Sequence, residues 1–363
     1  MSLARRLAQE AQARAFGVDR RLFAAGLGLI ACGFVLVLAS SPVAAARLRM
    51  DGAFDLAWRH AAAALAAIGL VGGLSLLNPK GVRRVAAGVF LLVMPMLVLV
   101  LLTGAEIKGS RRWLWVLGHS VQPSEWLKPA LVVLVAWMLA EKERNARFPG
   151  YLVSAALSGS ACLLLLQQPD VGQTVLLGVT LLVVLFLSGA PVAWAMGAVL
   201  AAAPVGAVVY ALFEHVRDRV DGLFNPGEQV LRAKDTIVSG GLLGRGPGEG
   251  VAKMRLPDAH ADFIYAVGAE EFGILLSIGL PGMYAWIAAR GLGAAQTVQD
   301  PFCRLAASGL ITLFALQAAI HIAVNLILAP AKGITLPFLS FGGSAMIGSA
   351  VTYGLALALL RRS

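Results

Sequence analysis

Charged residues are scarce in this sequence, and long runs of apolar residues take their place. Only 14% of the 363 residues are Asp, Glu, Lys or Arg, whereas 58% are hydrophobic and the mean hydropathy is +0.78. Soluble domains contain about 45–50% apolar residues. This composition therefore excludes an ordinary soluble domain and predicts a membrane protein.

Cysteine is also rare, and a continuous basic face is missing. Cys32, Cys162 and Cys303 lie in or beside apolar segments and form no C-x-x-C pair. This spacing excludes a disulfide framework and argues against a structural metal. The net charge is +10, but Lys and Arg occur in short clusters between apolar runs. We therefore exclude nucleic acid as a partner.

The apolar runs lack the alternation of polar and apolar residues that a membrane barrel requires. A helix crosses a bilayer with about 20 mostly apolar residues. We predict an all-α polytopic membrane protein with ten transmembrane helices. Their approximate bounds are 22–44, 55–76, 85–104, 124–140, 151–167, 171–188, 191–212, 263–289, 304–328 and 340–360. No internal repeat or linker is visible, so residues 1–363 are predicted to form a single membrane domain.

The termini and the long polar interval define the predicted topology. The first apolar run is longer than the ~7–15 residues of a signal-peptide core, so we expect a retained span after a cytoplasmic N-terminus at residues 1–21. Ten spans place the C-terminus on the same side. Residues 213–262 then form a large extracytoplasmic loop between helices seven and eight. Its seven Lys and Arg do not oppose this topology, because long loops cross regardless of charge.

Four clusters of polar residues stand out. They are Gly109–Trp113 with Gln122–Lys128, then Gln168–Gly172, then Leu256–Phe263, and finally Asn325 with Ala331–Ser344. The predicted topology places the first, third and fourth clusters on the outer face, and the second at the outer end of two spans. Convergence of distant polar groups on one face is what an active site in a helical bundle requires.

These clusters resemble the shape, elongation, division and sporulation (SEDS) family. The segments GSRRW, QPSEWLK, QPDVG, SGGLLGRGPGEG, LPDAHADFIYAVGAEEFG and KGITLPFLSFGGS follow the family's order and spacing over essentially the whole chain. The chain is most similar to the cell-division branch, and the elongation branch is the nearest competitor. The resemblance implies a peptidoglycan glycosyltransferase that polymerises lipid II outside the cytoplasmic (inner) membrane. It also implies a class B penicillin-binding protein and other division proteins as partners.

The resemblance further implies that Asp262 of the His-x-Asp-Phe motif is the essential acid. Glycan polymerisation needs an acceptor hydroxyl to attack the donor's anomeric carbon with inversion, while a lipid pyrophosphate leaves. A carboxylate can take the hydroxyl proton as general base. Asp262 precedes the eighth span, where the helix dipole favours the ionised form; position alone favours an N-cap without a chemical role. His260 either orients the site or lies on the surface, and Asp258 suits a turn or an interface.

Three cations are candidates for holding the leaving pyrophosphate: Arg112, Lys128 and Lys332. For Lys128 the alternative is an i,i+3 pair with Glu125, and the two roles are compatible. We include four further residues of these clusters as candidate substrate-binding residues, namely Gln122, Glu125, His260 and Ser344. Diphosphate chemistry often uses a divalent cation, but no motif here specifies a site for Mg²⁺.

Other polar residues have a structural interpretation. The Gly-rich run of residues 244–250 lacks the strand and helix of a dinucleotide-binding unit, so we predict a mobile loop. Glu270 and Glu271 fall within the eighth span, and we expect at least one of them to partner a buried cation or amide. Asp170 either lines the cavity or caps the sixth span, and we favour the cap.

Two other functions are compatible with these features. Intramembrane acids and interrupted spans also occur in transporters, which suggests a flippase for the same lipid. Against this, the chain has no visible internal repeat and its polar groups gather on one side. Helix faces rich in Gly and Ala would also suit a scaffold that activates a single-span partner synthase, and that role is compatible with catalysis.

Overall fold

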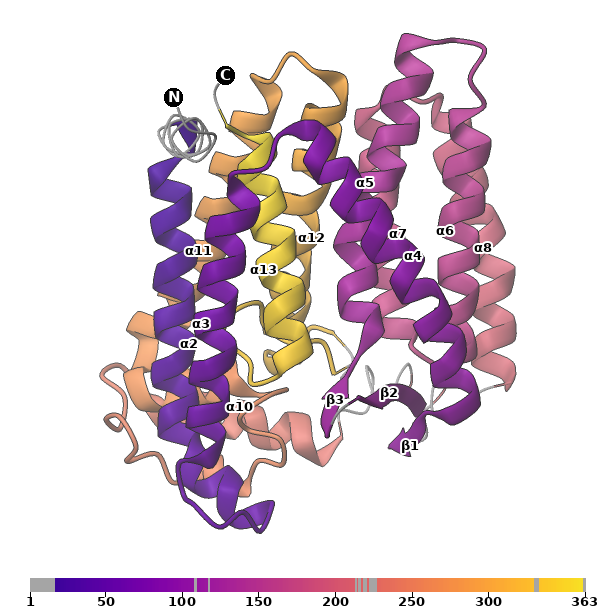
Figure 1. Cartoon of the computed structure of the whole chain (residues 1–363). Coiled ribbons are helices and arrows are strands. Elements are labelled where there is room, and N and C mark those ends of the chain that lie inside the picture. Colours follow the sequence, from indigo (N-terminus) through magenta and orange to yellow (C-terminus); the bar gives the residue numbers. More distant parts are fainter. Residues whose placement is uncertain are drawn as a thin grey trace.

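The computed structural model describes residues 17–107, 110–116, 118–212, 214, 217, 221, 227–329 and 333–361. Within them lie ten long apolar helices in one bundle (Figure 1). They are α2 (Arg20–Arg47), α3 (Asp55–Ser75), α4 (Pro79–Thr103), α5 (Pro123–Arg144), α6 (Gly150–Gln167), α7 (Val171–Leu187), α8 (Val192–Leu212), α11 (Ile264–Gln296), α12 (Pro301–Asn325) and α13 (Gly343–Leu359). Seven are long and apolar enough to cross a membrane, and α7 and α13 are shorter apolar helices.

Each predicted span corresponds to one of these helices, which confirms the fold class. The largest differences are at the start of α4 and the end of α11. The helix α4 begins six residues before the predicted span because Asn78 accepts a hydrogen bond from the Gly81 N–H and Pro79 occupies the first turn. Its first turns carry Lys80, Arg83 and Arg84, so the apolar run starts later than the helix does.

The interior of the bundle consists mainly of α5, α12 and α13. The helix α5 contacts α4, α6, α7, α12 and α13, and it is more buried than the other long helices. An intramembrane charge on such a helix faces protein rather than lipid. This position explains how Glu125 and Lys128 can lie on a membrane-spanning helix.

A non-helical segment, residues 333–341, enters the bundle between α12 and α13. Phe338 and Leu339 of this segment are fully buried, and the Phe338 ring packs against Phe314 and Tyr353 at centroid distances of 5.4 and 5.7 Å. Gly33 of α2 allows the approach, because a Cβ there would lie 2.2 Å from the Phe338 carbonyl oxygen. The segment is therefore part of the core.

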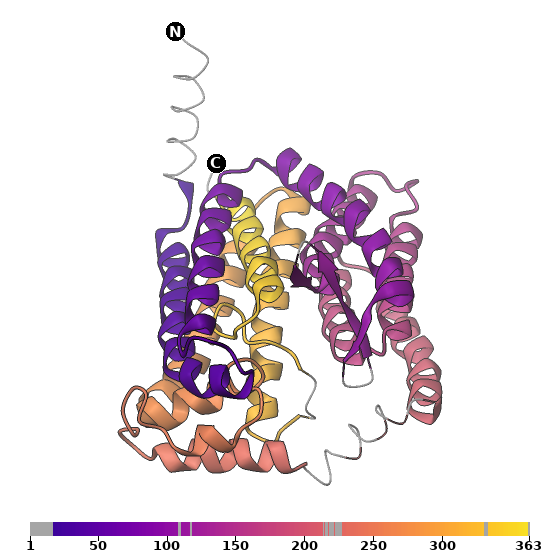
Figure 2. The same ribbon diagram turned by 60° about the horizontal axis from the view of Figure 1, so that its bottom comes forward.

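Short elements that the sequence did not predict cover one end of the bundle (Figure 2). Antiparallel strands β1 (Ala105–Ile107), β2 (Ser110–Val116) and β3 (His119–Val121) form a small sheet in that order. The predicted loop contains the amphipathic helix α10 (Glu228–Gly240) and the 3₁₀-helix η1 (Ala252–Arg255). These elements are too short and too polar to give a hydropathy signal.

The Gly-rich run is a packed turn in the structure, in place of the predicted mobile loop. It fits against α11 at Gly273, where the helix backbone breaks with φ of 65°. The Arg245 and Gly246 N–H groups donate to the carbonyl oxygens of Glu270 and Glu271 at 2.8 and 3.0 Å. Gly244 has φ of 80°, and a Cβ there would lie 2.2 Å from the Glu271 carbonyl oxygen. Glycine is required because backbone meets backbone at this point.

The two acids in α11 bind this loop, which confirms the prediction that at least one has a structural partner. The Glu270 carboxylate accepts hydrogen bonds from the N–H groups of Ala252 and Lys253 at 2.7 and 2.9 Å. The Glu271 carboxylate pairs with the Lys253 ammonium group. Both side chains of this pair are at most 1% exposed.

Candidate functional site

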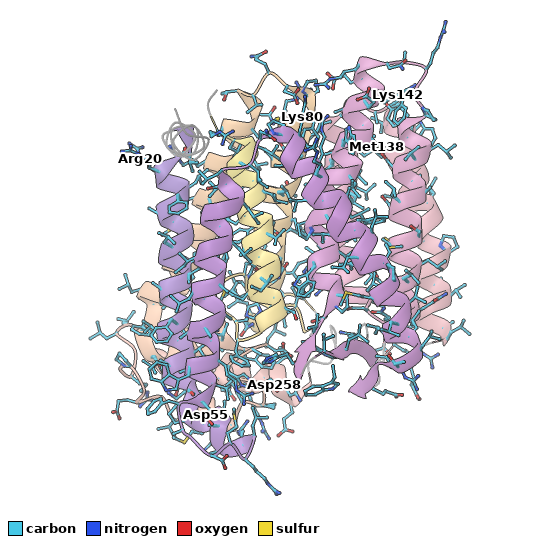
Figure 3. The ribbon with its side chains drawn as sticks, viewed as in Figure 1. Arg20, Asp55, Lys80, Met138, Lys142 and Asp258 are labelled. Carbon is cyan, nitrogen blue, oxygen red and sulfur yellow. The ribbon has the colours of Figure 1, made fainter. Side chains whose placement is uncertain are left out.

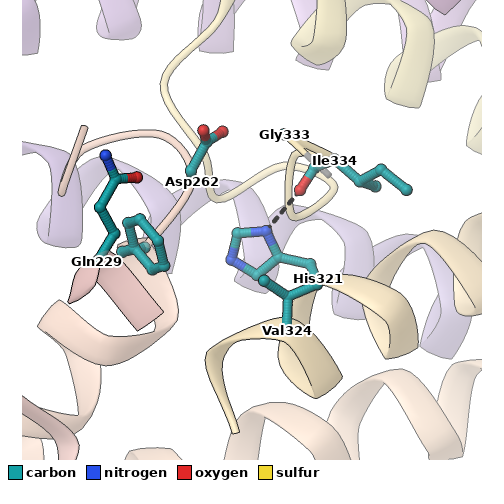
Figure 4. A pocket seen from close by; sticks show the side chains of 7 residues that line it. Gln229, Asp262, His321, Val324, Gly333 and Ile334 are labelled. Atoms are coloured by element: carbon teal, nitrogen blue, oxygen red, sulfur yellow. Dashed lines mark hydrogen bonds between the residues drawn. The ribbon is translucent and has the colours of Figure 1, made fainter. Parts of the chain in front are cut away.

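Asp262 lies in a small pocket at the end of the bundle that carries α10 (Figure 4). The pocket is lined by Gln229, Asp262, Phe263, His321, Val324, Gly333 and Ile334. Its volume is about 30 Å³, which accommodates water but not a sugar ring. Phe263 is the N-cap residue of α11 and makes no side-chain capping bond. The N-cap alternative therefore does not describe Asp262, whose half-buried side chain lines the pocket.

The backbone around Asp262 is held on both sides. Its N–H donates to the Asp258 carbonyl oxygen at 3.0 Å, and its carbonyl oxygen accepts from the Asn325 side-chain amide at 3.2 Å. The Ala261 carbonyl oxygen accepts from the Ser340 hydroxyl at 2.8 Å. The third and fourth sequence clusters are thus joined through the backbone of Ala261 and Asp262.

Gly333 lies beside the Asp262 carboxylate and forms part of the pocket wall. A Cβ at Gly333 would lie 3.9 and 4.0 Å from the two carboxylate oxygens, and the residue has φ of 60°. Glycine suits this backbone conformation. The predicted pyrophosphate residue Lys332 precedes Gly333 but lies outside the described residues.

His260 contributes its backbone and its ring separately. Its carbonyl oxygen accepts from the Phe341 N–H at 2.9 Å, and its ring packs edge-on against the Phe341 ring at 5.5 Å. Burial lowers the pKa of His260 below its usual range; the charge of Asp258 opposes this shift and Arg47 adds to it. The ring is therefore mainly neutral at pH 7. Asp258, with φ of 53°, begins the turn that leads to Asp262, which fits the turn interpretation.

Lys128 is the centre of a buried polar group that joins three helices. Its ammonium group donates to Glu125 of α5, Gln173 of α7 and Gln317 of α12, each at 2.9 Å. Lys128 and Glu125 are each 2% exposed, and the predicted i,i+3 pair is present. A lysine ammonium has three donors, and all three are used. Direct contact with a diphosphate would require one of these bonds to break.

Arg112 joins the first and second sequence clusters. From β2, its guanidinium donates to the Pro169 carbonyl oxygen at 2.9 Å and to the Ser110 hydroxyl at 3.1 Å, and it lies 3.4 Å from the Asp170 carboxylate. Asp170 occupies the predicted N-cap position of α7, but its carboxylate makes no capping bond. The acid pairs with Arg112 in place of the expected cap.

Gln122 and Ser344 form a joint between α5 and α13. The Gln122 N–H donates to the Ser344 hydroxyl oxygen at 3.0 Å, and the Trp126 indole donates to the Ser344 carbonyl oxygen at 3.3 Å. The contacts of both residues are structural. Their predicted role in substrate binding stays a prediction, as does that of Arg112, Glu125, Lys128 and His260.

Several residues of the site were not found by the sequence analysis. Gln229 of α10 and His321 of α12 line the pocket, and Gln317 connects Lys128 to Thr335 near it. A signal was present, because Gln317, His321 and Asn325 recur every four residues in an apolar helix. Within the part of the chain that the structure describes, no three His, Cys, Asp or Glu residues could hold a metal ion together. A role for Mg²⁺ stays untested.

Comparisons with known proteins agree with this architecture. The model of the FtsW/RodA/SpoVE family, described as cell cycle proteins, matches residues 20–363. The chain is 44% identical to the probable peptidoglycan glycosyltransferase FtsW of Caulobacter vibrioides, over 95% of this chain and 89% of that protein. It is 36% identical to the protein of the same description from Thiomicrospira cyclica, over 94% of this chain and 91% of that protein.

Two solved structures share the fold. One belongs to a peptidoglycan synthase complex described as coordinating polymerization and crosslinking; it has a TM-score of 0.76 and 28% identity, and covers 94% of this chain and 97% of its own. The other is the crystal structure of the rod shape determining protein RodA of Thermus thermophilus. Its TM-score is 0.66 at 27% identity, over 94% of this chain and 96% of RodA.

Proposed function

Because the chain belongs to the FtsW/RodA/SpoVE family of cell cycle proteins, we propose that it is a peptidoglycan glycosyltransferase of cell division. In this proposal it polymerises lipid II into glycan strands at the outer face of the cytoplasmic membrane. The observation that carries the proposal is Asp262, a half-buried carboxylate in a pocket where distant parts of the chain meet. Two relatives of the chain are described as probable peptidoglycan glycosyltransferases, and the chain covers about nine-tenths of the length of each.

In the proposed reaction, Asp262 acts as general base. The acceptor sugar hydroxyl gives its proton to the carboxylate while its oxygen attacks the donor's anomeric carbon. The bond to the lipid pyrophosphate breaks with inversion at that carbon. The developing negative charge on the pyrophosphate requires a cation. Arg112, 12% exposed beside the second cluster, and Lys332, next to Gly333 in the sequence, are the proposed candidates.

The pocket of about 30 Å³ is too small for a disaccharide, and the proposal therefore includes a movement of the loop elements beside it. Gln229 of the surface helix α10 lines this pocket. A shift of α10 away from the bundle would widen the pocket on that side. Such conformational steps accompany substrate binding in many enzymes.

The Lys and Arg of the short loops support the proposed orientation. Arg20, Lys80 and Lys142 lie at one end of the bundle, and Asp55 and Asp258 lie at the other (Figure 3). Short loops rich in Lys and Arg remain in the cytoplasm. We therefore place the end with Arg20, and with it both termini, in the cytoplasm, and the Asp262 pocket at the outer face.

We propose a class B penicillin-binding protein as the partner, together with other membrane proteins of the division machinery. A related solved structure is a complex for polymerization and crosslinking, and crosslinking is a second chemistry that a separate polypeptide can supply. The similarity to RodA keeps an elongation role as the alternative.

The flippase alternative is less well supported by the contacts of the intramembrane charges. Lys128 with Glu125, and Lys253 with Glu271, form buried pairs within the protein. Structural pairing accounts for these charges without a transport path. A flippase would move lipid II between the leaflets of a vesicle without making glycan.

The test is polymerisation of purified lipid II by the protein with a class B penicillin-binding protein, in membranes or detergent. We expect long glycan strands from the wild type and a loss of at least about 10²-fold in Asp262→Asn, because general-base catalysis contributes about 10²–10⁴-fold. The matched control is Asp258→Asn, since asparagine also tolerates the positive φ at that position. The control should remain active, whereas equal product from Asp262→Asn and the wild type would refute the proposed base.

A further inference from the structure

The segment of residues 333–341 has non-helical backbone inside a membrane protein, so its carbonyl groups need partners within the protein. The Ile334 carbonyl oxygen lies 2.7 Å from His321 Nδ1, and the Thr335 carbonyl oxygen accepts from the Gln317 amide at 3.1 Å. The Pro337 carbonyl oxygen accepts from the Tyr284 hydroxyl at 2.6 Å. Side chains of α11 and α12 therefore supply hydrogen bonds to backbone carbonyl groups of this segment, which includes Gly333 and forms one wall of the pocket.

Three of the polar residues of α12 contact both walls of the pocket from one face of the helix. Gln317, His321 and Asn325 are four residues apart, and this spacing places them above one another on that face. Gln317 binds the Gly333 wall at Thr335 and His321 binds it at Ile334. Asn325 donates to the backbone carbonyl of Asp262 on the other wall. We call these three residues the α12 ladder.

The chemistry of the partners fixes how the ladder is oriented. Lysine has donors only, so Lys128 must face the Gln317 side-chain oxygen. The Gln317 amide nitrogen then faces Thr335, where it donates to the carbonyl oxygen and to the hydroxyl at 3.2 Å. A carbonyl oxygen accepts only, so His321 Nδ1 must carry a proton to bind Ile334. Buried Lys128 therefore orients the first member of the ladder.

We propose that the α12 ladder is a positioning device, which holds the Asp262 carboxylate and the Gly333 wall at the separation that the reaction needs. The inference rests on the proposed function, because it assigns a role toward the same carboxylate. The ladder touches no reacting atom and acts through the backbone of the two walls. His321 contributes through Nδ1; its Nε2 has no hydrogen-bond partner among the residues described.

The pair His321→Asn and His321→Leu tests this role. An asparagine amide nitrogen lies close to the place of Nδ1 and can still donate to the Ile334 carbonyl oxygen, whereas leucine cannot donate. We expect His321→Leu to lower kcat for lipid II polymerisation by about tenfold to a hundredfold, since small misplacements of catalytic groups cost that much. KM should change less than kcat. His321→Asn should retain kcat within about threefold of the wild type.

A second measurement reports on the wall without requiring activity. Hydrogen exchange of the amides of residues 334–336 and 338–340 should become faster in His321→Leu and in Gln317→Leu. It should stay at the wild-type level in His321→Asn and in Asp262→Asn. If the wild type makes no glycan, the proposed function fails, but this exchange pattern still decides whether the ladder holds the wall.

Two results would overturn the inference. A His321→Asn variant as slow as His321→Leu would show that the imidazole ring itself, through Nε2, is what the reaction uses. Wild-type exchange and wild-type kcat in His321→Leu would show that the wall needs no ladder. If His321→Leu fails to insert as a monodisperse protein, Gln317→Leu is measured in its place, and wild-type exchange with wild-type kcat in that variant would overturn the inference.

Discussion

Lys128 and Lys253 are both buried, and their ammonium groups have different kinds of hydrogen-bond partner. Each side chain is at most 2% exposed, and each is paired with a buried glutamate. The other partners of Lys128 are the side-chain amides of Gln173 and Gln317. The other partners of Lys253 are backbone carbonyl oxygens, those of Ala39 at 2.9 Å and Gly248 at 3.2 Å.

The difference in partners separates two structural roles. An amide that accepts from a lysine must present its nitrogen to the next group, so Lys128 determines the direction of a chain of hydrogen bonds that reaches the pocket wall. A backbone carbonyl oxygen has no donor of its own, so accepting from a lysine does not orient a further hydrogen bond. Lys253 therefore holds α2, the Gly-rich turn and α11 together, and its influence ends there.

The largest expected effect is the loss of stability on replacing Lys253. Lys253→Met should lower the free energy of unfolding by about 3–5 kcal/mol, because Glu271 is left in the interior without its cation. The measurement is the unfolding midpoint in detergent. The double variant Lys253→Met/Glu271→Leu removes both charges and should recover most of the stability and the polymerase activity. Continued instability of the double variant would contradict the pairing argument.

A smaller effect is expected where the Gly-rich turn meets the kink of α11. Gly244→Ala adds a Cβ 2.2 Å from the Glu271 carbonyl oxygen at a φ of 80°, and it should cost about 2 kcal/mol of unfolding free energy. The matched control is Gly248→Ala, which has φ of 85° but open space around the added Cβ. The control should lose clearly less stability, and equal losses would mean that backbone strain alone explains both.

The smallest expected effect distinguishes the two lysines most sharply. The double variant Lys128→Met/Glu125→Leu should unfold closer to the wild-type midpoint than Lys253→Met does, because it leaves no buried charge without a partner. Its polymerisation rate should still fall about tenfold, or about 1.4 kcal/mol, because Lys128 then no longer holds the Gln317 side-chain oxygen. A wild-type rate for this variant would make Lys128 equivalent to Lys253 and remove it from the ladder argument.

The sequence predicted the bundle more completely than the site. Apolar runs are local signals, and all ten predicted spans are helices in the structure. The helix α10 and strand β2 were missed because both elements are short and rich in polar residues. The carboxylate at Asp262 was predicted from its motif, whereas Gln229, Gln317 and His321 were not, since each alone has the character of an ordinary residue of its helix.

Conversely, some residues that stood out in the sequence have a structural use. Lys128 is saturated by three partners, Asp170 pairs with Arg112, and Ser344 joins α13 to α5. Polarity within an apolar helix indicates that a side chain has a partner. It does not indicate whether that partner is the protein or a substrate.

The sequence by itself determined the number and position of the apolar helices, the polar end of the bundle and the acid at its centre, because hydropathy and short motifs are properties of neighbouring residues. Only the tertiary structure decided which polar groups meet. Lys128 and Gln317 are separated by 189 residues, and Arg112 and Pro169 by 57. A hydrogen bond forms where donor and acceptor are brought to about 3 Å, and helix packing sets that distance.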